Sequence, residues 1–143
     1  MKIHTSLFVF IATAFTTVAH ADTFVMVRNA KAPGGQVSKA EVRAFFTGKT
    51  KMFGNDVAVV VVPTDDLPAF GVFVDQVFST NTKTLLAKIK QEVFKGDMAK
   101  PLKAASDDDV IRLVGGTPGA IGVVTPAAAK TLPSTVVVLP VGG

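Results

Sequence analysis

The stretch that decides the fold runs from residue 57 to 78 and reads Val-Ala-Val-Val-Val-Val-Pro-Thr-Asp-Asp-Leu-Pro-Ala-Phe-Gly-Val-Phe-Val-Asp-Gln-Val-Phe. Residues 57–62 are apolar at every position and rich in β-branching, which is typical of a strand covered on both faces. After Pro63 the pattern changes to helical spacing. This stretch therefore predicts a buried strand and then a helix that packs into the core through Phe70, Phe73, Val74, Val77 and Phe78.

Upstream of this stretch the sequence predicts a short strand and a helix. Residues 24–27 are apolar and are followed by a Pro-Gly-Gly turn at 33–35. Ser38 has Glu41 three residues later, the spacing of a capping box at a helix start. This helix is expected to end near Gly48 and to bury Val42, Phe45 and Phe46.

Downstream, strands and helices continue to alternate. Thr82 or Thr84 is expected to open a helix that ends at Gly96, with Leu85, Leu86, Ile89 and Val93 inward. Residues 97–105 are interpreted as a loop, and Ser106 as the start of another helix. Strands are predicted at 120–124 and 135–139, with a short helix at 126–130. The interleaved order predicts an α/β sandwich of about three layers.

The first 21 residues have the pattern of an export signal. Lys2 precedes an apolar stretch over residues 7–14, and Ala19-His20-Ala21 has the small-x-small form of a cleavage site. Cleavage there would leave residues 22–143 as one domain of 122 residues. Losing Lys2 would lower the net charge from +4 to +3. We therefore predict a periplasmic or secreted protein.

The composition of residues 22–143 narrows the function further. They contain no His, Cys, Trp or Tyr, because both histidines lie in the first 21 residues. Without His or Cys there is no Ser-His or Cys-His pair and no zinc site of the usual kind, so we predict no enzyme, no metal and no cofactor. A mild charge with Phe as the only aromatic residue argues against nucleic-acid binding. No second apolar run approaches membrane-spanning length, which predicts no transmembrane segment in the mature chain.

Three groups of residues occur in a familiar order. Residues 38–46 form the predicted helix that ends in Phe46-Thr47-Gly48-Lys49, and Phe94-Lys95-Gly96 is followed by Pro101. Residues 106–110 read Ser-Asp-Asp-Asp-Val and residues 117–122 read Thr-Pro-Gly-Ala-Ile-Gly. In this order the segments resemble phosphate-type periplasmic binding proteins. The resemblance implies a type II periplasmic-binding fold, with a mixed, mostly parallel sheet flanked by helices, and the length implies a single lobe.

The resemblance also implies a ligand, a small anion such as phosphate. We take Thr64, Asp65, Asp66, Gly119 and Ala120 as candidate ligand-binding residues. The family's phosphate-binding Arg and Ser-Gly-Thr stretch are absent after residues 57–62, and Val123 stands where the family often has Tyr. Two carboxylates at that place would oppose an anion. The family's ligand chemistry therefore does not carry over directly.

Each candidate also has a purely structural interpretation. We favour residues 64–66 as an N-cap for the following helix. Asp107, Asp108 and Asp109 suit a helix N-terminus better than a cation site. Six lysines between residues 83 and 103 could attract an anion, lipid headgroups or an acidic partner, although a solvated helix face is the usual meaning. They are Lys83, Lys88, Lys90, Lys95, Lys100 and Lys103.

The leading hypothesis is an exported, non-enzymatic, solute-binding-like protein. Its rival is an interaction module without a ligand, which docks on an envelope sensor, a transporter or a second copy of itself. Residues 23–28 would support self-association if that strand lay at a sheet edge.

Overall fold

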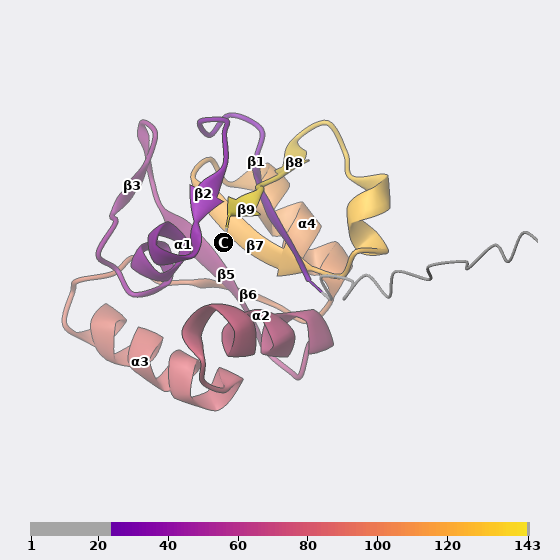
Figure 1. Cartoon of the computed structure of the whole chain (residues 1–143). Coiled ribbons are helices and arrows are strands. Elements are labelled where there is room, and N and C mark those ends of the chain that lie inside the picture. Colours follow the sequence, from indigo (N-terminus) through magenta and orange to yellow (C-terminus); the bar gives the residue numbers. More distant parts are fainter. Residues whose placement is uncertain (1–23, 143) are drawn as a thin grey trace, which may run out of the picture.

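The computed structural model describes residues 24–142, so the predicted export signal lies outside the described residues. Its centre is a five-stranded sheet in the order β6-β5-β7-β1-β8 (Figure 1). The strands are β1 (Val25–Asn29), β5 (Val59–Pro63), β6 (Leu102–Ala104), β7 (Ala120–Val124) and β8 (Val136–Val138). β5 runs parallel to β6 and β7, and β1 is antiparallel to β7 and β8. Four of the five strands thus share one direction, which confirms the mixed, mostly parallel sheet.

Strand β1 is an interior strand. It lies between β7, where Val25 pairs with Val124, and β8, where Arg28 pairs with Val137. The condition for self-association through this strand, a position at the sheet edge, is therefore not met. In the described part of the chain, the edges of the large sheet belong to the three-residue strands β6 and β8.

The helices begin at the residues that cap them. Ser38 accepts a hydrogen bond from the Glu41 N–H and opens α1 (Lys39–Phe46). Ser106 accepts from the Asp109 N–H and opens α4 (Asp107–Gly116). α3 (Thr82–Phe94) begins at Thr82, as expected, and its cap is Asn81, whose side chain accepts a hydrogen bond from the Thr84 N–H. Asn ranks above Thr as a helix cap, which fits this position. The remaining helices are α2 (Pro68–Phe78) and the 3-10 turn η1 (Ala128–Thr131).

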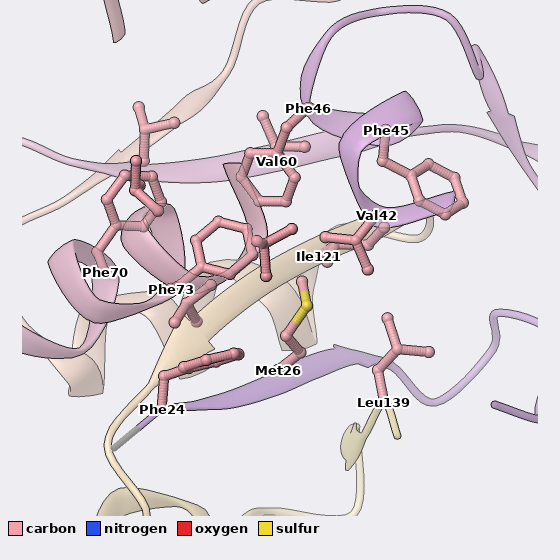
Figure 2. Close-up of a cluster of buried hydrophobic side chains, with 14 of the residues drawn as sticks. Phe24, Met26, Val42, Phe45, Phe46, Val60, Phe70, Phe73, Ile121 and Leu139 are labelled. Atoms are coloured by element: carbon pink, nitrogen blue, oxygen red, sulfur yellow. The ribbon is translucent and has the colours of Figure 1, made fainter. Parts of the chain in front are cut away.

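The alternating side chains of β5 enter two separate cores. Val60 and Val62 pack with α1, α2 and α3 on one face, whereas Val61 packs with α4 on the other. This is why every position of the strand is apolar. The larger core holds a cluster of phenylalanines, in which the Phe46 and Phe73 ring centroids lie 5.0 Å apart (Figure 2). The prediction that the phenylalanines of residues 70–78 pack into the core is confirmed for Phe70 and Phe73, which are buried, and Phe78 is half-buried against them.

Several short strands occur where none was expected. β6 lies inside the predicted loop 97–105. β3 (Met52–Phe53) and β4 (Asp56–Val57) form a hairpin before β5, and β2 (Val37–Ser38) pairs in parallel with β9 (Val141–Gly142). Strands of two or three residues are too short to show a period of two. Within residues 24–142, no helix is both long enough and apolar enough to cross a membrane.

Candidate functional site

Open α/β sheets bind ligands beyond the carboxyl ends of their strands, at the point where the strand order reverses. Here that point lies between β5 and β7, because the chain moves from β5 outward to β6 and then returns to β7 on the other side. Thr64, Asp65 and Asp66 follow β5 at this edge, and all three are exposed. Thr125 follows β7 there, and Ser106 opens α4 just beyond β6. In this fold class, a ligand is therefore expected at this edge.

Residues 64–66 do not cap α2, which corrects the interpretation favoured from the sequence. The cap position is Leu67, which makes no side-chain cap hydrogen bond, and Pro68 occupies the first turn. Proline suits the first helical position because its fixed φ is already helical. The Thr64 N–H instead donates to the Ala104 carbonyl oxygen at 2.9 Å, and its hydroxyl donates to the same oxygen at 3.3 Å. Thr64 thus ties β5 to β6.

The N-terminus of α4 is occupied by its own side chains. The Asp107 carboxylate accepts from the N–H and the hydroxyl of Thr125, at 3.1 and 2.6 Å. The Asp109 carboxylate accepts from the Ala105 N–H at 3.1 Å. These carboxylates use donors that an oxyanion would need, and they add negative charge to the edge that carries Asp65 and Asp66. The carboxyl edge of the sheet is therefore poorly suited to phosphate.

Gly119 and Ala120 lie at the opposite end of the sheet from Thr64. Ala120 pairs with Val59, the first residue of β5, while Thr64 follows its last residue. Gly119 has φ +82°, and a Cβ there would collide with the Val57 carbonyl oxygen. Ala120 is completely buried. The five residues proposed from the sequence therefore do not form one site. Glycine is required at position 119 by its positive φ and by the close approach of the Val57 carbonyl oxygen.

A pocket of about 440 Å³ opens between α3 and the β5–β6 edge of the sheet. Its apolar lining comes from the end of β5, from the face of α3 that carries Leu86, Ile89 and Val93, and from Pro101. Lys90 lies on α3, Lys100 lies just before β6 and Lys103 lies within β6. No Asp or Glu occurs among its described lining residues. Thr64 is also part of the lining, so one residue proposed from the sequence belongs to this pocket.

The six lysines of residues 83–103 divide into two groups in the structure. Lys90, Lys100 and Lys103 line the pocket, whereas Lys83, Lys88 and Lys95 do not. All six are exposed. Lys95 makes a salt bridge of 3.6 Å with Glu92. All six lysines thus reach solvent, and three of them also border the pocket. The sequence does not separate the two groups, because the short strand β6 gives no strand signal of its own.

Cation binding has no support in the described residues. Between residues 24 and 142 no group of three or more His, Cys, Asp or Glu side chains is placed to hold a metal ion. Asp107 and Asp109 are engaged in the hydrogen bonds described above, and Asp109 also contacts Arg112 at 3.4 Å. Their arrangement is that of an acidic first helical turn.

Solved structures with the same fold are substrate-binding proteins of phosphate transport. A protein from Clostridium perfringens, described as a phosphate ABC transporter substrate-binding protein with bound phosphate, aligns with a TM-score of 0.63 and 15% identity over 83% of this chain. The fold is similar to about half of this substrate-binding protein. A phosphate transport receptor from Vibrio cholerae aligns with a TM-score of 0.61 and 12% identity over 83% of this chain. PstS from Borrelia burgdorferi aligns with a TM-score of 0.61 and 14% identity over 85% of this chain.

The lobe spans less than half of each of these proteins, 44%, 46% and 47% of their chains respectively. No sequence-family profile matches the chain, and no curated protein matches it in sequence. The likeness confirms the fold class predicted from the sequence, a single lobe with a mostly parallel sheet.

Proposed function

We propose that the chain is an exported, non-enzymatic binding protein that holds a small anion in the lysine-lined pocket between α3 and β6. One observation carries the proposal. The pocket brings Lys90, Lys100 and Lys103 together with no carboxylate among its described lining residues, whereas the carboxyl edge of the sheet carries Asp65, Asp66 and the acidic start of α4. An anion is attracted to the first surface and repelled by the second.

The fold and the composition support the other parts of this proposal. The solved structures with the same fold are transport-related binding proteins. The described residues contain neither His nor Cys, so the commonest nucleophile and proton-shuttle chemistries lack their side chains. The pattern of residues 1–21 supports export.

Calorimetric titration with inorganic phosphate at low ionic strength tests the anion site. We expect weak binding, in the millimolar range, because the three lysines are exposed and their ammonium groups act through solvent. The affinity should fall as salt is added. A titration that stays flat up to tens of millimolar phosphate contradicts the proposal.

A matched pair of variants locates the binding. The triple variant Lys90→Gln, Lys100→Gln, Lys103→Gln should lose phosphate binding. The control triple variant Lys31→Gln, Lys49→Gln, Lys130→Gln removes the same charge from exposed positions outside the pocket, and we expect it to keep binding. If both variants lose phosphate affinity equally, phosphate binding depends on net charge alone, which would refute a specific site.

One further observation favours the rival function, docking on a partner. The Phe94 side chain at the end of α3 is 91% exposed, and Met52 on β3 is 49% exposed. Met52 lines a hollow together with Gly96 and Met98, which follow Phe94 closely in the sequence. Light scattering of the wild type and of Phe94→Ser tests self-association through this surface. A monomer at every concentration in both proteins would exclude a second copy as the partner.

A further inference from the structure

We infer that the ligand of the lysine-lined pocket is an amphiphilic anion, whose apolar chain lies on the pocket floor and whose headgroup lies among the three lysines. The inference rests on the proposed anion-binding function and names the ligand class. A fatty-acid carboxylate and the acidic headgroup of a lipid with its acyl chain share this chemistry.

The floor of the pocket is an apolar surface that a bare inorganic ion, held weakly at the lysines, would leave unused. Val62 and Pro63 contribute from β5, and Leu86, Ile89 and Val93 form one stripe along α3 at helical spacing. Ile89 is buried, but Leu86 and Val93 are only half-buried, because no described segment covers this part of the α3 stripe. A hydrated ion gains nothing from such a surface and loses solvation against it. A hydrocarbon chain gains free energy in proportion to the apolar area that it covers.

The cationic side chains stand on both sides of this floor. Lys90 belongs to α3, Lys100 precedes β6 and Lys103 lies within β6. Lysine packs its aliphatic stem along apolar surface and keeps its ammonium group in water, which suits the boundary between a chain and a headgroup. The hydroxyl of Thr64 already donates to the Ala104 carbonyl oxygen, so the lysines are the donors left for a headgroup at this end of the pocket.

The size of the pocket agrees with a chain-bearing ligand. Its volume of about 440 Å³ falls within the ~300–1,000 Å³ typical of small-molecule sites. Such sites combine mostly apolar walls with a few polar groups that fix orientation, and this pocket has that composition. By contrast, the edge beyond β5 and β7 has carboxylates that are already hydrogen-bonded to the Ala105 N–H and the Thr125 hydroxyl.

Titration of the wild-type protein with straight-chain carboxylates from acetate to decanoate, all kept monomeric, tests the inference. We expect the affinity to rise roughly two- to fourfold with each added methylene, since each buried methylene contributes up to a fourfold gain. 1-Decanol should bind at least about tenfold more weakly than decanoate, and the triple variant of Lys90, Lys100 and Lys103 should abolish that difference. The control triple variant of Lys31, Lys49 and Lys130 should retain it.

The outcomes separate this inference from the function on which it rests. If phosphate binds and its binding requires the lysines, but the affinity for carboxylates does not depend on their chain length, the amphiphilic ligand is refuted and the anion site is retained. Absence of lysine-dependent binding for any anion would overturn both. Val93→Gln, at a half-buried position, should flatten the chain-length dependence without loss of helical circular dichroism, and an unchanged dependence would contradict the assigned floor.

Vesicles distinguish the two sources of the ligand. Binding of monomeric decanoate without sedimentation on phosphatidylglycerol vesicles would support a free amphiphile. Sedimentation on these vesicles that decanoate competes away would support a lipid as the source. If the protein sediments with the vesicles and decanoate does not reduce this binding, the lysines bind a membrane surface and the proposed pocket ligand is refuted.

Discussion

The buried Asn29 offers a demanding test of how β1 is held in the sheet. It is 4% exposed, and its Nδ2 donates to the carbonyl oxygens of Val114 and Gly115 at 2.8 and 3.2 Å. Its Oδ1 accepts from the Lys31 N–H at 2.9 Å. Asn29→Ala would leave the Val114 carbonyl, in the last turn of α4, with only a long contact of 3.4 Å from the Thr117 N–H.

The expected cost follows from these contacts. A buried polar group that loses its partner costs about 1–3 kcal/mol, and an ordinary hydrogen bond contributes about 1 kcal/mol net. Lys31 is exposed, so we expect its N–H to form a hydrogen bond with water instead. We therefore expect Asn29→Ala to lower the free energy of unfolding by about 2–4 kcal/mol.

Urea unfolding followed by far-UV circular dichroism measures this change, because the chain has no Trp or Tyr to report by fluorescence. With a typical urea slope, the midpoint should fall by roughly 1–3 M. Asn55→Ala, at an exposed position in the β3–β4 turn, is the control and should shift stability by less than about 0.5 kcal/mol. Equal midpoints for the Asn29 and Asn55 variants would refute the assigned bonds.

Two further substitutions test the cores on either side of the sheet. In Gly122→Ala the new Cβ would meet Val110 Cγ1 at 2.5 Å, so thermal unfolding should show a loss of about 1–3 kcal/mol, whereas Gly116→Ala has no atom within 4 Å and should lose nothing. A tolerated Gly122→Ala would contradict the contact of β7 with α4. Phe73→Ala removes a completely buried ring and should lower the free energy of unfolding by about 3–5 kcal/mol. Phe94→Ala, at a 91% exposed position, should lower it by less than about 0.5 kcal/mol. Similar losses for the two variants would contradict the burial of Phe73 in the core.

The main elements could be predicted because their signals are local. The unbroken β-branched run of β5 and the helical spacing of Phe70, Phe73 and Val77 each report their own burial. Ser38 and Ser106 marked helix starts through a side-chain bond three residues away. The start of α2 also has a local signal, because Pro68 favours the first helical position. The carboxylates of residues 64–66 indicate an N-cap instead, and that interpretation is wrong.

The site could not be predicted, because its parts are distant in sequence. The pocket joins Val62, the α3 stripe and Lys100 to Lys103, and only the pairing of β6 with β5 brings them together. Strand β6 has three residues, one of them an exposed lysine, at a sheet edge where lysines commonly discourage further pairing. No local pattern distinguishes such a strand from a loop. The contacts of Asn29 with α4 span 85 residues or more and are equally invisible in the sequence.

The place where an anion binds tests the central claim most directly. Phosphate is titrated into ¹⁵N-labelled protein while the backbone amide shifts are followed. We predict that the shifts concentrate at Lys90, Lys100 and Lys103 and their neighbours, and that they disappear in the triple Gln variant. Shifts centred on residues 106–109 and Thr125 would place the anion at the carboxyl edge of the sheet and contradict the account.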